Sequence, residues 1–205
     1  MDALNKETQS AITPDKALEL LKEGNERFVS GNILNRDLNK QVSQTCKGQW
    51  PMAVVLGCID SRVPAELVFD QGIGDIFNVR VAGNFSNTDI LGSIEYGCKV
   101  AGSKLVVVLG HEGCGAVKGA CDGVELGNIT ALLSNLKDAV SSVEEDGDRS
   151  SANSDFVSRV VSQNVNFTVD DLRADSPILM EMEKNGEIKI VGAVYDVATG
   201  KVTWK

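Results

Sequence analysis

The sequence predicts an α/β fold in which a mostly parallel central β-sheet is flanked by helices. Two apolar runs, at residues 52–56 and 105–109, are each followed by glycine, as is typical of buried strands. Segments with apolar residues at helical spacing alternate with these and with later strand-like segments. This alternation indicates right-handed crossovers between parallel strands. We expect about four parallel strands and one antiparallel C-terminal strand.

Residues 1–50 are expected to form an N-terminal helical arm. Thr13 suits the N-cap of a helix, Pro14 suits its first position, and Gly31 suits its end. A second, more polar helix is expected at 37–46. The sequence leaves open whether the first of these helices packs on its own sheet or on a partner subunit.

Residues 51–205 are expected to form the α/β core, and a length of 205 residues fits a single domain made of arm and core. The expected elements of the core, in chain order, are a strand at 52–56, a short helix at 63–69, a strand at 76–81, a helix from Asn87 or Thr88 to Gly102, a strand at 105–109, helices at 128–143, 154–172 and 178–183, a strand at 189–197 and its hairpin partner at 201–204. The helix at 128–143 is expected to turn inward an apolar face made of Ile129, Leu132, Leu133, Leu136 and Val140.

Composition restricts the kinds of partner that we expect. The chain carries 20 basic and 29 acidic residues, a net charge of −9, which argues against nucleic acid or an anionic membrane. No apolar run approaches the roughly 18 residues that span a bilayer. Residues 1–13 are polar and lack the apolar core of a signal peptide. A cytoplasmic location is expected, and a periplasmic one stays open for a chain whose signal peptide has been removed.

Three metal-binding residue types follow two of the predicted strands. Cys58 follows the first apolar run, and His111, the only histidine, follows the second together with Cys114. Because the carboxyl ends of parallel strands meet at one edge of a sheet, these side chains are placed to meet. Two thiolates and an imidazole suit zinc, although cysteines after strands are also common core residues. The other cysteines are interpreted as reduced packing residues: Cys46, Cys98 and Cys121.

Two motifs together resemble those of the bacterial-type β-class carbonic anhydrases. The first, CIDSR, spans residues 58–62, and the second, HEGC, spans residues 111–114. The resemblance covers about residues 14–204. Further stretches that are similar to the same family lie at 72–80, 92–96 and 194–200.

The resemblance implies a carbonic anhydrase, a zinc lyase that reversibly hydrates carbon dioxide to bicarbonate and a proton by attack of zinc-bound hydroxide. It implies one Zn²⁺ per chain, held by Cys58, His111 and Cys114, and a homodimer or a dimer of dimers. Asp60 and Arg62 are implied as a catalytic dyad. While Asp60 pairs with Arg62, the fourth zinc position is open to water and Asp60 orients the hydroxide. When Asp60 binds zinc instead, the site is closed.

Further pocket residues are implied by the same resemblance. Four positions match residues that line the family's substrate pocket: Gln49, Phe77, Tyr96 and Gly115. In this family the N-terminal helices commonly wrap the partner, so some of these side chains are expected to reach the neighbour's zinc. Without the resemblance, Phe77 and Tyr96 would be interpreted as core residues and Gln49 as a surface residue. Some members with a closed, bicarbonate-inhibited site carry Trp where this chain has Val55; although Gly57 and Tyr195 resemble that group, the missing Trp favours the open state here.

Two alternatives to carbon dioxide hydration follow from the same residues. In the first, the same metal site hydrolyses carbonyl sulfide or carbon disulfide. In the second, zinc is structural and the chain is a binding module, although a structural site needs no Asp60–Arg62 pair. Because the single histidine is assigned to the metal, no histidine remains to carry protons away, and turnover is expected to depend on buffer.

Overall fold

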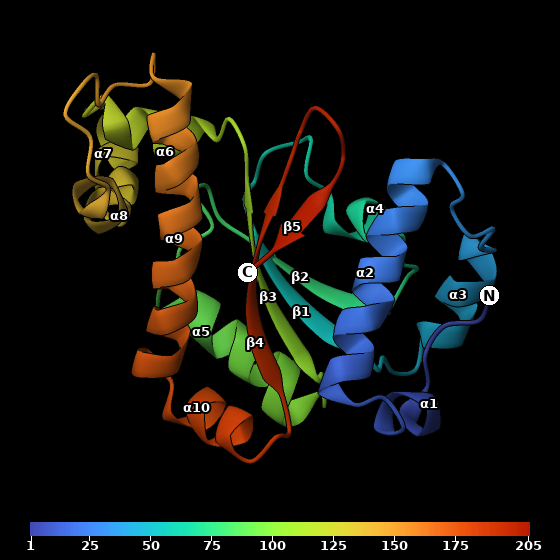
Figure 1. The fold of residues 1–205 in the computed structure, drawn as a ribbon. Helices are drawn as coiled ribbons and strands as arrows, with labels where there is room; N and C mark the ends of the chain where they lie inside the picture. The colour runs from blue at the N-terminus through green and yellow to red at the C-terminus, as the bar shows by residue number, and fades with distance from the viewer.

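Five β-strands form a single sheet in the computed structural model, which describes residues 1–205 (Figure 1). The strands are β1 (Ala53–Gly57), β2 (Ile76–Arg80), β3 (Leu105–His111), β4 (Lys189–Tyr195) and β5 (Val202–Trp204). Their order across the sheet is β2-β1-β3-β4-β5. Strands β1 to β4 are parallel, and β5 is antiparallel to β4. The predicted sheet is therefore confirmed.

Helices cover both faces of this sheet. They are α1 (Lys6–Ser10), α2 (Pro14–Ser30), α3 (Leu38–Thr45), α4 (Ala65–Val68), α5 (Thr88–Glu95), the π-helix η1 (Tyr96–Val100), α6 (Gly115–Cys121), α7 (Gly127–Ser134), α8 (Lys137–Ser142), α9 (Ser154–Asp175) and α10 (Pro177–Lys184). Helices α2 and α4 lie on one side of the sheet, and α5, α9 and α10 lie on the other (Figure 1). None of these helices combines the length and the apolar character needed to cross a bilayer.

The core has one layer on each face of the sheet, because successive residues of a strand point to opposite faces. Val55 packs in the cluster that contains Leu21 of α2, whereas Val54 packs in the cluster that contains Ile94 of α5. Every residue of β1 and β3 is buried. Covering on both faces explains why these two strands are continuous apolar runs in the sequence.

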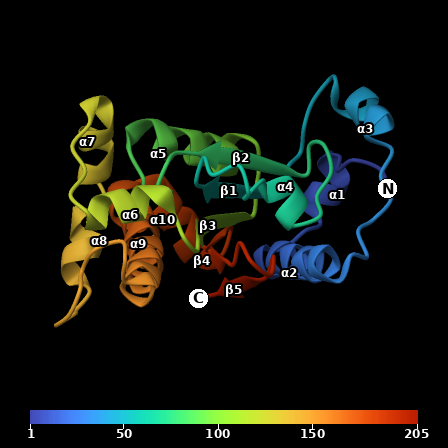
Figure 2. The same ribbon diagram turned by 90° about the horizontal axis from the view of Figure 1, so that it is seen from above.

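The N-terminal helix α2 packs on the sheet of its own chain, which is one of the two possibilities that the sequence left open. It begins after the predicted cap Thr13 and ends at Gly31, whose φ of 74° is in the left-handed region. The arm is fixed to the core by Asp70, a buried carboxylate that pairs with both Arg27 and Arg36. Helix α3 projects from the body of the molecule beyond α1 (Figure 2).

The prediction of one helix at 128–143 is wrong. Helices α7 and α8 occupy this segment, and the chain turns between them at Asn135. The Asn135 amide donates hydrogen bonds to two carbonyls in the last turn of α7, at 3.2 and 2.9 Å, and so ends that helix. Because of the turn, Ile129 of the predicted inner face is 44% exposed, whereas Leu136 is fully buried.

The helix predicted from Asn87 or Thr88 to Gly102 is formed by α5 and the π-helical turn η1 that continues it, whereas two short helices, α1 and α6, are not predicted by apolar periodicity. Helix α1 is too short to show a period, and its signal is the cap: the Asn5 side chain accepts hydrogen bonds from the backbone of Glu7 and Thr8. Helix α6 contains two glycines and has no side-chain cap. Its position after β3 matters, because it begins at a predicted metal ligand.

Candidate metal centre

The ends of β1 and β3 bring the three predicted ligands together. The two strands are adjacent and parallel, with Gly57 paired to Leu109. Cys58 follows β1, His111 ends β3, and Cys114 is the N-cap residue of α6. Their ligand atoms all lie within 4.8 Å of one another. The three residues are 4%, 0% and 1% exposed, so the cluster is withdrawn from bulk water.

The histidine of this cluster is oriented for a metal. Its Nδ1 lies 3.0 Å from the backbone oxygen of Glu112, so Nδ1 carries the proton and donates it to this carbonyl. Its Nε2 is buried and has no hydrogen-bond partner in the protein. A buried nitrogen lone pair beside two sulfurs is a donor set that fits Zn²⁺.

The surroundings of the two cysteines favour a thiolate at Cys58. Their sulfurs lie 3.9 Å apart. The hydrogen bond between them lowers the pKa of Cys58 to about 4 and raises the pKa of Cys114 above its usual value. The backbone N–H of Gly83 donates to Cys58 Sγ at 3.4 Å, and the N–H groups of Ala116 and Val117 favour the Cys114 thiolate. Thiolate is the form that binds metal ions.

The predicted pair of Asp60 and Arg62 is formed. Arg62 donates from Nε to Asp60 Oδ1 at 2.9 Å and from Nη2 to Oδ2 at 2.8 Å, the two-pronged geometry typical of Arg and carboxylate. The Arg62 hydrogen bonds hold the pKa of Asp60 well below its usual range. Asp60 Oδ2 lies 3.9 Å from Nε2 of His111. The carboxylate therefore stands beside the ligand cluster.

Sequence reasoning did not assign a role to Arg80, which supports this loop. Arg80 ends β2 and is paired in the sheet with Gly57. It donates from Nε to the backbone oxygen of Cys58 at 2.7 Å and from Nη2 to that of Asp60 at 2.6 Å. The sequence carries no signal for this role, because the two carbonyls that Arg80 binds are 22 and 20 residues away in the chain.

The predicted pocket residues are not all near the ligands. Gly115 is next to Cys114, and open space lies where a Cβ would stand. Phe77 and Tyr96 contact each other with ring centroids 6.3 Å apart. They line a hollow of about 770 Å³ beside β2 and α5, which no ligand residue lines. Gln49 is exposed. Within one chain, the pocket roles of these three residues stay predictions.

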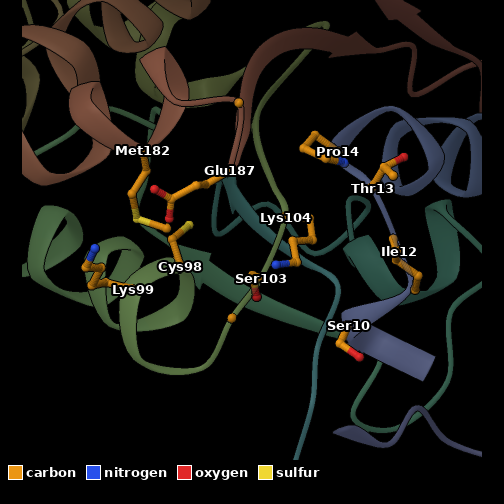
Figure 3. Close-up of a pocket in the computed structure, with 12 residues that line it drawn as sticks. Ser10, Ile12, Thr13, Pro14, Cys98, Lys99, Ser103, Lys104, Met182 and Glu187 are labelled. Atoms are coloured by element: carbon orange, nitrogen blue, oxygen red, sulfur yellow. The ribbon is translucent and has the colours of Figure 1, made fainter. Parts of the chain in front are cut away.

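A second hollow, of about 430 Å³, lies near the amino ends of β3 and β4, between η1, α10 and the start of α2 (Figure 3). Cys98 and Met182 point toward each other in it (Figure 3). Burial raises the pKa of Cys98 to about 12, so this thiol stays protonated. This hollow contains one uncharged thiol and no imidazole. It therefore lacks a set of metal donors comparable to Cys58, His111 and Cys114.

Comparisons of the sequence and of the structure with known proteins both find carbonic anhydrases. A carbonic anhydrase family model matches residues 53–202. The carbonic anhydrase of Mycolicibacterium smegmatis is 40% identical over 194 residues, which cover 92% of this chain and 92% of the relative. The β-carbonic anhydrase CafA of Aspergillus fumigatus has a TM-score of 0.70 at 25% identity, over 93% of this chain and 89% of that one. A tetrameric β-carbonic anhydrase of Sordaria macrospora shares the fold, with a TM-score of 0.67 at 24% identity over 81% and 89% of the chains.

The parallel sheet with a buried cluster of two cysteines and a histidine at its carboxyl edge defines an α/β protein with a group that can hold a metal ion. The chain belongs to the β-class carbonic anhydrases. It is therefore a carbonate dehydratase, a zinc-binding lyase that interconverts carbon dioxide and bicarbonate.

Proposed function

We propose that this chain hydrates carbon dioxide reversibly at one zinc ion held by Cys58, His111 and Cys114. The observation that carries the proposal is the unpartnered Nε2 of His111 beside two buried sulfurs. When bound, zinc supplies a Lewis-acidic fourth position at which water loses a proton near neutral pH. Two thiolate ligands offset the charge of the ion, so we expect activity to rise toward alkaline pH.

Asp60 and Arg62 would control the fourth position. Held by both prongs of Arg62, Asp60 would leave that position to water, and its Oδ2, which lies 3.9 Å from Nε2 of His111, would accept a hydrogen bond from the reacting group. Accepting this hydrogen bond orients the attacking lone pair toward carbon dioxide. Release from Arg62 and rotation toward His111 would replace the water and close the site.

The assembly that we propose is a homodimer, or a dimer of dimers, joined at β2. Strand β2 ends the sheet, so one edge of its backbone lacks a partner strand. Tyr96, beside this edge, is 54% exposed. Pairing there would carry Gln49, Phe77 and Tyr96 toward the metal of the neighbouring subunit. The arm, residues 1–50, would wrap the partner with exposed apolar side chains that include Ile33, Leu34, Leu38 and Val42.

The test is stopped-flow carbon dioxide hydration on protein of measured zinc content, from neutral to alkaline pH and in dilute and concentrated buffer. Asp60→Asn keeps the shape of the side chain but removes the charge that Arg62 binds. We expect it to lower the rate about 100-fold while zinc content stays at one per chain. The matched control is Asp155→Asn, which removes the carboxylate of an exposed pair with Arg159 and should leave the rate unchanged.

Three outcomes would contradict parts of this proposal. A zinc-loaded wild type that is inactive at every pH would mean either that Asp60 closes the site or that carbon dioxide is not the substrate, and the assay would then turn to carbonyl sulfide and carbon disulfide. An Asp60→Asn variant with the wild-type rate would exclude the role of the dyad. A rate that is independent of buffer concentration would show a proton route within the protein that needs no second histidine.

A further inference from the structure

We propose that Asn164, in the middle of α9, is a positioning residue for the metal centre: it holds the backbone of Gly83 so that the Gly83 amide donates to the Cys58 thiolate. The proposal rests on the assignment of Cys58 as a zinc ligand. Asn164 lies on a helix that contributes none of the three ligands. Its effect would reach the metal through one turn of backbone.

The turn that follows β2 has an unusual backbone conformation. Gly83 has a φ of 85° and the next residue, Asn84, has a φ of 42°. A left-handed conformation is disfavoured for a residue with a side chain, and it persists where the surroundings impose it. Asn84 is 1% exposed, and its N–H donates to the Val81 oxygen at 3.0 Å. The turn is therefore both buried and conformationally demanding.

Asn164 makes the side-chain contact that fixes this turn. Its Nδ2 donates to the Gly83 backbone oxygen at 2.8 Å, and Asn164 is only 3% exposed. On the other side of the same residue, the Gly83 N–H donates to Cys58 Sγ at 3.4 Å. The two bonds meet on a single residue, so Asn164 restrains the position of the residue whose N–H faces the sulfur.

The turn has no room for a side-chain donor in place of this amide. A Cβ on Gly83 would lie 3.0 Å from Leu136 Cδ1 and 3.4 Å from Ala116 Cβ, in addition to the cost of its positive φ. The backbone N–H is thus the group that this turn can offer to the thiolate. A hydrogen bond to a ligand sulfur withdraws electron density and so tunes the charge that the sulfur gives to the metal.

If Asn164 only tied α9 to the turn, its replacement would change the free energy of unfolding and nothing at the metal centre. Cobalt(II)-substituted protein separates the two roles, because the energy of the sulfur-to-cobalt charge-transfer band depends on hydrogen bonding to the thiolates. Asn164→Leu has similar volume and no donor. The matched control is Asn166→Leu, since Asn166 is exposed on the same helix and bonds only the nearby Gln163.

For Asn164→Leu we expect the charge-transfer band to move to longer wavelength and the zinc affinity to fall about 10-fold, measured by chelator competition. Asn166→Leu should match the wild type in both. On cadmium-113-loaded wild type, the Gly83 amide proton should show scalar coupling to the metal through the sulfur. If Asn164→Leu does not fold, Asn164→Ser replaces it, with the same expected shift.

An unshifted band in the variant, or no coupling to the Gly83 amide in the wild type, would overturn the role of Asn164. Both results leave the zinc assignment intact, because they require a metal-loaded protein. A wild type that binds no cobalt through sulfur would instead overturn the proposed zinc site itself. Failure of the role of Asn164 is therefore distinguishable from failure of the zinc site.

Discussion

Replacing Arg80 tests whether the support of the ligand loop is as important as the ligands. Arg80→Leu keeps much of the aliphatic stem and removes the hydrogen bonds to the Cys58 and Asp60 carbonyls. A hydrogen bond from a charged donor contributes about 1.5–3 kcal/mol net. Because Arg80 is half-buried and water replaces part of each bond, we expect a loss of about 2 kcal/mol for the pair. This corresponds to a fall in Tm of about 6 °C for a chain of this size.

The loop should also hold the metal less well. Loss of a residue that orients the ligands typically lowers metal affinity 10–100-fold, so we expect at least about a 10-fold weaker zinc affinity in Arg80→Leu. The free energy of unfolding is measured by urea titration of the metal-free protein, and zinc affinity by competition with a chelator. The two measurements separate general instability from a defect at the metal centre.

Arg149 provides a matched control for this prediction. It is also half-buried and donates to two backbone carbonyls, those of Val143 and Val140, at 2.8 and 2.7 Å. Arg149→Leu should therefore lose similar stability and bind zinc with wild-type affinity. If Arg80→Leu and Arg149→Leu weaken zinc binding equally, or if neither does, the support that we assign to Arg80 is refuted.

Three further predictions concern packing, pH and thiol chemistry. In Gly24→Ala the new Cβ would lie 1.9 Å from the Phe69 backbone oxygen, so α2 must separate from α4. Urea titration should show that the free energy of unfolding falls by about 3 kcal/mol. An unchanged urea midpoint of unfolding would contradict this contact. Burial opposes ionisation of Asp70, but hydrogen bonds from two arginines outweigh it and hold its pKa below the usual range. Because the pKa of Asp70 is lower in the folded than in the unfolded chain, its ionised carboxylate stabilises the fold above the unfolded pKa, and this stabilisation is lost as pH falls. The free energy of unfolding should therefore decrease below about pH 4. The decrease should be smaller in Asp70→Asn. Iodoacetamide at neutral pH should modify exposed Cys46 and spare Cys98, because burial raises the pKa of the Cys98 thiol to about 12. Equal labelling of the two cysteines by mass spectrometry would show that Cys98 is accessible.

The sheet and the ligand cluster were predictable because their signals are local. Residues 52–56 and 105–109 are apolar throughout, and two parallel strands necessarily place the residues that follow them at one edge. The sequence alone therefore places Cys58 and His111 at the same edge of the sheet, and the observed strand order, in which β1 and β3 are neighbours, brings them together. The Asp60–Arg62 pair is predictable for the same reason, since its two members are separated by one residue.

Features that depend on distant contacts were not predictable. The break at Asn135 depends on side-chain hydrogen bonds that compete with a good helical period. Arg80 and Asn164 each act on backbone groups far away in sequence, and a single sequence contains no record of such pairings. Helix α6 has weak propensity, with two glycines in seven residues, and owes its place to the end of β3.

Zinc held by Cys58 and Cys114 would also act as a clasp on the chain. The two sulfurs are 56 residues apart in sequence, and closing a loop of that length lowers the entropy of the unfolded chain by the equivalent of about 4 kcal/mol. A disulfide has this effect only under oxidising conditions, whereas a zinc clasp works among reduced thiols and opens when zinc is withdrawn. Zinc starvation would then affect the amount of enzyme as well as its activity, since the unclasped chain unfolds more often and is exposed to proteases.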